Sequence, residues 1–303
     1  MYSLNQRFDN TVIPEDEFLT SGNLACAGCA ASLSMRLALK GLGKPTVLAV
    51  PACCWTIIPG AWPVSIMDVP FFHCAFETTA ATASGIKAAF RRRGMDDICV
   101  VGWAGDGGTL DIGIQALSGA AERNEDVVYV CYDNEAYMNT GIQRSSSTPW
   151  GASTTTSPAG KISKGQHTQK KDLPKIAIAH NIPYVATACP SFPFDLMEKV
   201  QKAAAVQGPA YLHIFSVCPT GWRIPPEEAI RYGRLAVNTC VFPLYEYEYE
   251  KYRLTYRPSP ILPVREYIEG QGRFRHLTPE DIDSIEERTM AEYEKLVKLS
   301  EEG

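Results

Sequence analysis

The sequence predicts a doubly wound α/β fold with a mostly parallel sheet, and three observations support this prediction. Short apolar runs without polar alternation recur along residues 46–219, as expected for strands that are covered on both faces. Most of these runs are followed by a stretch in which apolar residues have helical spacing. Glycines, prolines and capping residues separate the two kinds of segment. Such alternation of strand and helix is typical of a parallel sheet with helices on both faces.

The elements are expected in a regular order along the chain. Helices are predicted at residues 30–42, 76–93, 109–123, 173–182 and 194–208, and strands at residues 46–54, 97–105, 126–134, 183–190 and 209–219. The strand, helix and strand between residues 97 and 134 form a parallel unit, and its crossover should be right-handed.

Two segments depart from this alternation. Residues 135–172 are rich in Ser, Thr, Gly and Pro, and loops of this length are usually functional or disordered. We expect residues 1–225 to form the main α/β domain and residues 226–303 to form a C-terminal extension that packs on the domain or on a partner. Its last helix should begin near Thr278 and Pro279, which are favourable starting residues.

Composition narrows the class of protein. The chain has 303 residues, 45% of them hydrophobic, and a formal net charge of -5. The short basic runs at residues 91–93 and 170–171 are too small for a nucleic-acid-binding surface, which needs clustered Lys and Arg. No apolar run approaches the roughly 18 residues of a membrane span, and the N-terminus lacks a signal-peptide pattern. We therefore expect a cytoplasmic protein without a membrane partner, in which ten cysteines serve as core thiols, catalytic groups or metal ligands.

The sequence GDGGTLD places acids and glycines at the end of a predicted strand. Asp106 follows this strand and Asn134 follows the next one. If the strands are neighbours, about 4.8 Å apart, their oxygens could bind one Mg²⁺. Gly105, Gly107 and Gly108 would let the backbone approach an anion at the start of a helix. A magnesium-bridged diphosphate is favoured over a glycine turn and an Asx turn in an unrelated α/β protein. A nicotinamide fold is disfavoured, because the motif G-x-G-x-x-G is absent.

The stretch GDGGTLDIGIQALSGAAERNEDVVYVCYDNEAYMN resembles the thiamine diphosphate signature, in which GDG is followed by an Asn one strand later. The resemblance implies a thiamine diphosphate-binding fold. It implies that the backbone carbonyl of Ala136 completes a magnesium site with Asp106 and Asn134. It also implies that Asn139 is a catalytic residue near the thiazolium and that Thr140 contacts the diphosphate.

Cysteines form a second constellation. Cys26 and Cys29 lie in the sequence CAGC, Cys53 and Cys54 lie in PACCW, and Cys218 ends the last predicted strand. A Cys-x-x-Cys pair fits one tetrahedral metal or one face of an iron–sulfur cluster. Structural thiols and zinc are the alternatives, although a zinc ribbon would need a second Cys-x-x-Cys.

This cysteine spacing resembles that of the β subunit of 2-oxoacid:ferredoxin oxidoreductases of the pyruvate synthase type. The resemblance covers roughly residues 20–225 and includes the sequence NEAYMNTGIQRSSSTPWGASTTTSPAGK. It implies that a [4Fe–4S] cluster lies next to the thiamine diphosphate and is bound by Cys26, Cys29, Cys54 and Cys218. Of the adjacent pair, the family spacing selects Cys54 rather than Cys53.

The resemblance also implies the activity. The family oxidatively decarboxylates a 2-oxoacid, most often pyruvate, and passes single electrons to the cluster and on to ferredoxin, while coenzyme A takes the acyl group. 2-Oxoglutarate, branched-chain oxoacids and oxalate are alternative substrates. The expected partners are an alpha subunit, with the substrate pocket and the glutamate that activates the pyrimidine, and gamma- and delta-type subunits. A non-catalytic electron-transfer subunit and a thiamine decarboxylase with buried thiols remain open.

Other residues have simpler expected roles. Glu77 and Asp111 are acids predicted in the first turns of helices, where a negative charge is favourable. His73 could line the pocket or be a core histidine. Five further cysteines in apolar surroundings are expected in the core: Cys74, Cys99, Cys131, Cys189 and Cys240.

Overall fold

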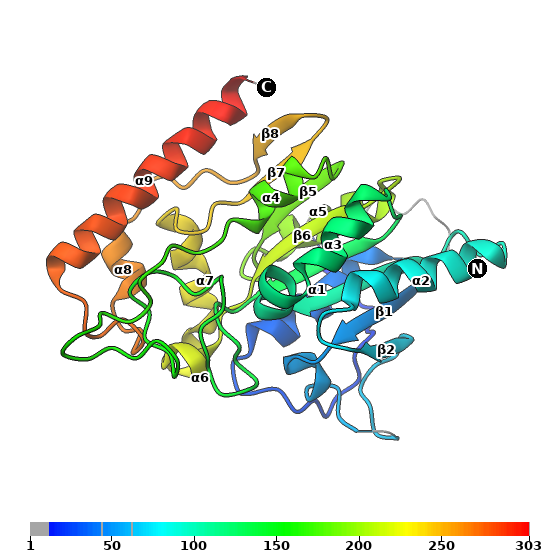
Figure 1. The fold of residues 1–303 in the computed structure, drawn as a ribbon, viewed down its shortest axis with the longest axis horizontal. Helices are drawn as coiled ribbons and strands as arrows, with labels where there is room; N and C mark the ends of the chain where they lie inside the picture. The colour runs from blue at the N-terminus through cyan, green and yellow to red at the C-terminus, as the bar shows by residue number, and fades with distance from the viewer. Residues whose placement is uncertain (1–11, 44, 62, 303) are drawn as a thin grey trace.

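The protein was examined as a computed structural model that describes residues 12–43, 45–61 and 63–302. One sheet runs through this part of the chain, with the strand order β2-β1-β3-β4-β6-β5-β7-β8 (Figure 1). Its strands are β1 (Thr46–Pro51), β2 (Phe71–Cys74), β3 (Cys99–Gly105), β4 (Val128–Asp133), β5 (Tyr184–Ala188), β6 (Ala210–Phe215), β7 (Tyr245–Glu248) and β8 (Lys251–Leu254).

The first six strands are parallel, and only β7 and β8 run antiparallel to their neighbours. Every residue of the central strands β3, β4 and β6 is buried, which explains why these segments show no polar alternation. The predicted mostly parallel α/β class is therefore confirmed, and the carboxyl ends of β3, β4 and β6 meet at one edge of the sheet.

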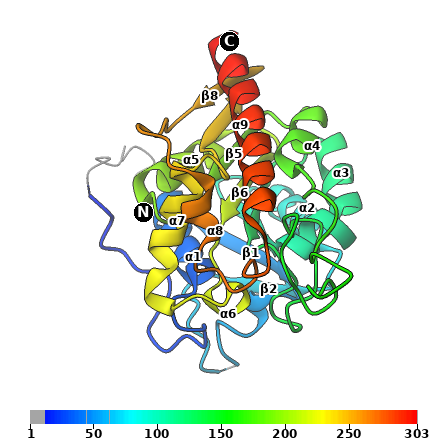
Figure 2. The ribbon, with the colours of Figure 1, turned by 90° about the vertical axis from the view of Figure 1, so that its left-hand side faces the viewer.

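Helices cover both faces of the sheet. They are α1 (Ala30–Leu42), α2 (Thr79–Arg92), α3 (Ile114–Glu122), α4 (Leu173–Ala179), α5 (Pro193–Ala205), α6 (Pro219–Trp222), α7 (Ala229–Asn238), α8 (Val264–Ile268) and α9 (Pro279–Glu302). Helices α1 and α5 pack together on one face, and α2, α3 and α4 lie on the other (Figure 2). No helix in the described residues is long and apolar enough to cross a membrane.

The segment after residue 225 extends this architecture. β7 pairs with β5, so the β7–β8 hairpin belongs to the same sheet. Helices α7, α8 and α9 enclose an apolar cluster with residues that follow β6, among them Val217 and Trp222. The domain boundary at residue 225 stays a prediction.

Several local expectations were wrong. The segment 71–74 forms the edge strand β2, which the sequence reading missed because its side chains are half-buried or exposed. Cys74 lies on this edge strand and is only half-buried, whereas the other four cysteines expected in the core are buried. The helix expected from residue 76 begins at Thr79, so Glu77 precedes it. His73 is exposed on β2 and is therefore not a core histidine.

Candidate active site at the carboxyl edge of the sheet

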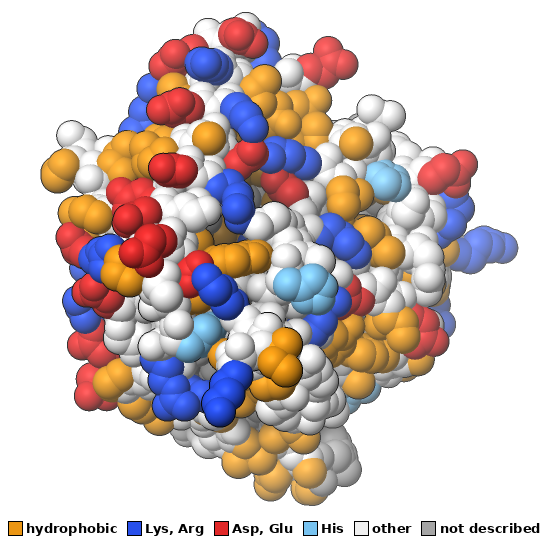
Figure 3. Space-filling view, turned by 60° about the vertical axis from the view of Figure 1, so that its left-hand side comes forward, with side chains coloured by type: hydrophobic (Ala, Val, Ile, Leu, Met, Phe, Trp, Pro, Cys, Tyr) orange, Lys and Arg blue, Asp and Glu red, His pale blue; other side chains and the backbone are white. Residues whose placement is uncertain are grey.

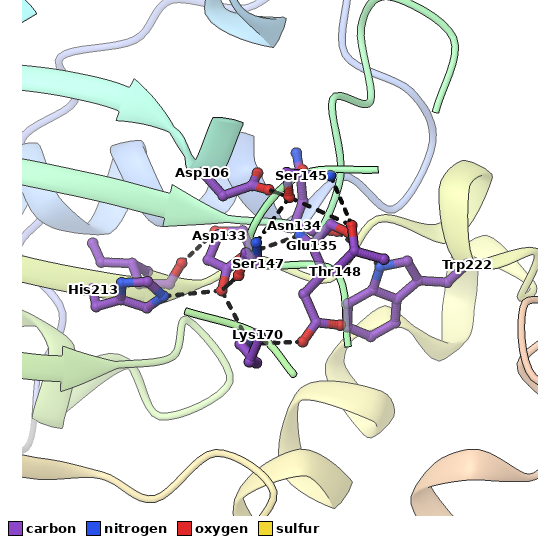
Figure 4. A network of polar contacts seen from close by, with 12 residues as sticks. Asp106, Asp133, Asn134, Glu135, Ser145, Ser147, Thr148, Lys170, His213 and Trp222 are labelled. Carbon is purple, nitrogen blue, oxygen red and sulfur yellow. Dashed lines mark hydrogen bonds and ion pairs between the residues drawn. The ribbon is translucent and has the colours of Figure 1, made fainter. Parts of the chain in front are cut away.

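Two neighbouring strands bring the predicted metal ligands together. β3 and β4 are parallel neighbours, and Gly105 is paired with Tyr132 near their carboxyl ends. Asp106 directly follows β3 and Asn134 directly follows β4, so both side chains lie at the same edge (Figure 4). Both residues are buried. The expectation that the two strands are neighbours is thus confirmed.

Three oxygen atoms converge between these strand ends. The side-chain amide oxygen of Asn134 lies 3.0 Å from Oδ1 of Asp106 and 2.9 Å from the carbonyl oxygen of Ala136. All three are hydrogen-bond acceptors, so none can donate to another. The contact is relieved either by turning the amide, so that its NH₂ donates to both oxygens, or by a cation between the three. Carboxylate, amide and carbonyl oxygens are ligands of Mg²⁺ and Ca²⁺, and the donor set therefore fits the predicted metal.

The electrostatics of Asp106 also favour a cation. Burial, and then the negative charge of Asp133, raise the pKa of Asp106 well above its ordinary value of 3.8. The hydroxyl of Ser145 donates to Oδ2 and offsets only part of this effect. A buried carboxylate in such surroundings gains most from a bound positive charge.

A second buried carboxylate, Asp133 at the end of β4, is compensated by the protein itself. Its Oδ2 lies 2.9 Å from Nε2 of His213 and 3.3 Å from Nζ of Lys170, and it accepts the hydroxyl of Ser147. The backbone N–H of Glu135 donates to its Oδ1. Although burial acts in the opposite direction, Lys170 and His213 hold the pKa of Asp133 below its ordinary value. Although the two acids are neighbours, the pKa of Asp106 is therefore raised and the pKa of Asp133 is lowered.

Four consecutive hydroxyl residues, Ser145–Thr148, attach the long loop to these strand ends. Their side chains donate, in order, to the carboxylates of Asp106, Asp111 and Asp133 and to the backbone carbonyl of Glu135. Sequence reasoning missed these residues. The signal that could have revealed them was a run of hydroxyls in a loop that follows two strand ends with acids.

The glycine-rich turn after β3 packs tightly against a tyrosine of the loop. A Cβ atom at Gly107 would lie 2.3 Å from Cε1 of Tyr137, so only glycine allows this packing. The hydroxyl of Tyr137 donates to the carbonyl of Gly107 at 3.3 Å. Gly105 and Gly108 are buried beside this turn, and their expected contact with an anion stays a prediction.

Asp111 has a different role from the expected one. It lies in a π-helical turn, η2 (Gly107–Ile112), and α3 begins only at Ile114. Asp111 is therefore not in the first turn of α3. Its carboxylate accepts hydrogen bonds from the hydroxyls of Tyr137 and Ser146, and so it anchors the loop.

Two residues that the resemblance places at the cofactor lie on the exposed side of the loop. Asn139 and Thr140 are both exposed, and the hydroxyl of Thr140 donates to the side-chain oxygen of Gln143. The trio of oxygens lies deeper, since Ala136 is buried. The roles of Asn139 and Thr140 stay predictions.

Backbone hydrogen bonds gather the predicted cysteine ligands from three segments. The N–H of Leu24 donates to the carbonyl of Ile58, which ties the CAGC segment to the turn after β1. The N–H of Ala30 donates to the carbonyl of Val217, which ties the same segment to Cys218. Cys54 begins the short helix η1 (Cys54–Thr56), and its N–H donates to the hydroxyl of Tyr132, the residue before Asp133 on β4.

The four thiols influence each other electrostatically. Burial, and then the nearby thiols of Cys53, Cys218 and Cys29, raise the pKa of Cys54. Burial raises the pKa of Cys218 to about 11, and Cys29 and Cys26 add to this effect. Because the pKa values of Cys29, Cys54 and Cys218 are all raised, these three thiols are difficult to ionise together, which suits a cationic centre that neutralises them.

Among the residues that the structure describes, no three His, Cys, Asp or Glu side chains are placed to hold a metal ion. In an iron–sulfur cubane each cysteine binds a different iron atom, so the ligands stand further apart than around one ion. Four cysteine thiolates bind a [4Fe–4S] cluster or zinc, so the donor set of Cys26, Cys29, Cys54 and Cys218 fits the predicted cluster and also the alternative.

Cys53 and Cys54 face different surroundings. After burial, the thiols of Cys53, Cys218 and Cys29 raise the pKa of Cys54, in that order. Burial raises the pKa of Cys53 to about 11, and Cys74 on β2 adds to this effect. The choice of Cys54 as the ligand of the adjacent pair stays a prediction.

Comparisons with known proteins agree with this geometry. Residues 56–214 match the family of thiamine pyrophosphate enzymes, through its C-terminal TPP binding domain. The chain is 51% identical over 297 residues to the ketoisovalerate oxidoreductase subunit VorB of Pyrococcus furiosus, and the match covers 95% of each chain. It is 54% identical over 275 residues to the pyruvate synthase subunit PorB of Methanothermobacter marburgensis, covering 91% of this chain and 96% of that one.

A solved structure shares the fold. A 2-oxoglutarate:ferredoxin oxidoreductase from Magnetococcus marinus, solved with 2-oxoglutarate, coenzyme A and succinyl-CoA bound, superposes with a TM-score of 0.59. The match covers 74% of this chain and 81% of that chain, with 24% sequence identity. At this identity the likeness extends to the fold alone.

Proposed function

This chain belongs to the thiamine pyrophosphate enzymes as a beta subunit of the 2-oxoacid:ferredoxin oxidoreductase family, and we propose that it carries the cofactor half of the active site. The observation that carries the proposal is the convergence of Asp106, Asn134 and Ala136 oxygens at one sheet edge. Asp106, Asn134 and Ala136 would hold Mg²⁺, and the turn of Gly105, Gly107 and Gly108 would lie against the diphosphate.

The cysteines would hold the electron acceptor. Three backbone-linked segments bring Cys26, Cys29, Cys54 and Cys218 to the edge that also carries Asn134, and Nδ2 of Asn134 lies 4.0 Å from Sγ of Cys54. This short connection supports a [4Fe–4S] cluster beside the thiamine diphosphate. When bound, thiamine diphosphate supplies the decarboxylation chemistry and the cluster accepts single electrons. The reducing compartment that free cysteines need is, in this proposal, the cytoplasm.

In this proposal, the residues of this chain position the metal ligands and compensate buried charges, and they transfer no protons. Ser145 holds the orientation of Asp106 by a hydrogen bond to Oδ2, so that Oδ1 is directed at Asn134. His213 and Lys170 neutralise Asp133, which keeps a second negative charge from competing for the cation. Asn139 and Thr140, on the exposed loop, would face the substrate side of the cofactor. An alpha subunit would close this side and supply the glutamate that activates the pyrimidine.

Pyruvate is the proposed substrate. The 54% identity to a pyruvate synthase subunit supports it, and the 51% identity to a ketoisovalerate oxidoreductase subunit makes a branched-chain 2-oxoacid the second candidate. Coenzyme A as acyl acceptor, ferredoxin as electron acceptor, and gamma- and delta-type subunits complete the proposal.

The test uses the complex that is co-purified with this chain under anaerobic conditions. Its kcat/KM is measured with pyruvate, 2-oxoisovalerate, 2-oxoglutarate and oxalate, with coenzyme A and a viologen dye as electron acceptor. We expect the highest kcat/KM with pyruvate. A higher kcat/KM with 2-oxoisovalerate would make that acid the proposed substrate, and the proposed reaction would be unchanged. If none of the four acids reduces the dye, the proposed activity is wrong.

A further inference from the structure

The C-terminal segment reaches the loop that carries two of the three converging oxygens. Arg273, far along the chain from this loop, is only 3% exposed, and its guanidinium lies 2.7 Å from Oε2 of Glu135. The same guanidinium stacks over the ring of Trp222 at 3.8 Å and donates from Nε to the side chain of Gln271. Arg273 is therefore fixed on several sides when it meets Glu135.

Glu135 occupies a special place between Asn134 and Ala136. Its φ of 68° lies in the left-handed region, which is unfavourable for a residue with a side chain. Its buried carboxylate is held by Arg273 and by Nζ of Lys170 at 2.9 Å. These two ion pairs stabilise the side chain of a residue whose backbone conformation is unfavourable.

The backbone carbonyls of this loop show the consequence. The carbonyl of Asn134 accepts from Nε1 of Trp222 at 3.0 Å, and the carbonyl of Glu135 accepts from the hydroxyl of Thr148 at 2.7 Å. The next carbonyl, that of Ala136, is the one that faces the Asn134 amide oxygen and the candidate cation. The left-handed turn at Glu135 separates these carbonyls and directs that of Ala136 into the site.

We propose that Arg273 is a positioning residue for the magnesium site, acting through Glu135 and Trp222 to hold the carbonyl of Ala136 and the side chain of Asn134 toward the cation. This inference rests on the proposed magnesium–diphosphate site. It gives the C-terminal segment a role in cofactor binding, although the segment supplies no ligand of its own. Arg273 carries its charge on a planar group that pairs with a carboxylate while stacking on an aromatic ring, which lysine cannot do.

The test measures metal affinity rather than turnover. The assembled complex, freed of divalent metal and saturated with thiamine diphosphate, is titrated with Mn²⁺, which prefers the same oxygen ligands. Room-temperature electron paramagnetic resonance counts the free ion. We expect Arg273→Met to raise the Kd for Mn²⁺ about 10- to 100-fold, the cost typical of losing an outer partner of a metal site. Arg273→Lys should raise it less, because the charge beside Glu135 is kept.

Arg275→Met is the matched control, because Arg275 is exposed two residues along the same segment, and its Kd should equal that of the wild type. In a Glu135→Gln background, Arg273→Met should have a much smaller effect on Kd. The melting temperature of the metal-free complex is measured for each variant. An unchanged Kd with a lowered melting temperature would make Arg273 merely structural and overturn the inference. If Arg273→Met fails to fold, Arg273→Lys decides by the same criterion. Failure of the wild type to bind Mn²⁺ would instead overturn the magnesium site, and the inference with it.

Discussion

At the scale of single residues, two neighbouring carboxylates have different tasks. Asp133 is surrounded by Lys170, His213 and the hydroxyl of Ser147, so its charge is matched within the protein. Asp106 receives the hydroxyl of Ser145, and its Oδ1 lies 3.0 Å from the side-chain amide oxygen of Asn134. A buried acid with too few donors is costly unless a cation completes its surroundings. This contrast supports our proposal that Asp106, rather than Asp133, is the metal ligand.

Replacing Asp106 separates the two cofactor sites. Asp106→Ala should weaken binding of thiamine diphosphate with Mg²⁺ by more than the roughly 10- to 100-fold that loss of an outer partner costs. The visible absorbance of the cluster should be unchanged, because no cysteine is altered. Equilibrium dialysis and absorbance spectroscopy of the anaerobic complex measure both. Asp97→Ala is the control, because Asp97 is exposed before the other end of β3. Normal cofactor binding by Asp106→Ala would remove Asp106 from the site.

The adjacent cysteines allow an equally direct comparison. Cys54→Ser should reduce the iron and sulfide content of the complex and its visible absorbance, because the family spacing selects Cys54 as a ligand and the thiols of Cys218 and Cys29 are near enough to raise its pKa. Cys53→Ser should keep them, because Cys53 is not among the proposed ligands. Chemical iron analysis of anaerobic preparations measures the difference. The opposite result would exchange the roles of the two cysteines.

At the scale of elements, the sequence predicted what depends on local pattern. The buried strands β3, β4 and β6 and the helices α1 and α5 follow from apolar runs and helical spacing. It missed β2, whose four residues are half-buried or exposed and so give no apolar run. It missed the hydroxyl run at Ser145–Thr148 for a different reason. Those contacts join residues up to 39 positions apart, and no local pattern encodes such a separation.

The β7–β8 hairpin gives a prediction that depends on pH. Glu246 on β7 is buried and accepts from the hydroxyl of Tyr184, Nζ of Lys202 and the guanidinium of Arg253. Although burial opposes it, these partners lower the pKa of Glu246 below its ordinary value of 4.5. The charge of Glu246 therefore stabilises the fold above pH 4.5, and this contribution is lost as the pH falls further.

Glu246→Gln should accordingly lower the free energy of unfolding by about 1–3 kcal/mol at neutral pH. The difference from wild type should shrink as the pH falls below 4.5. Urea unfolding of the purified chain at several pH values measures it. Glu250→Gln, in the exposed turn of the same hairpin, should have little effect at any pH. A difference that is constant with pH would show that the charge of Glu246 does not stabilise the hairpin.

At the scale of the whole molecule, the candidate site lies at an open edge. Asn139 and Thr140, on the loop that follows its ligands, are exposed. Apolar side chains also gather at the lower end of the molecule, near the cysteine segments (Figure 3). In the chain segments that carry the predicted cysteine ligands and in the turn that follows them, Leu24, Ile57 and Val64 are 62%, 50% and 74% exposed. We predict that another subunit covers this surface, because a contiguous exposed apolar patch marks an interaction site.

The chain on its own should therefore be inactive. Decarboxylation on thiamine diphosphate needs a site from which water is excluded, and here the loop above the candidate diphosphate site faces solvent. We expect the chain expressed without partners to show no 2-oxoacid-dependent dye reduction, although it assembles its cluster when reconstituted anaerobically. Adding the alpha subunit should restore turnover, and the rate should saturate near one alpha subunit for each copy of this chain. Full activity of the isolated chain would show that it builds a closed pocket by itself, and the division of the active site between two chains would then be wrong.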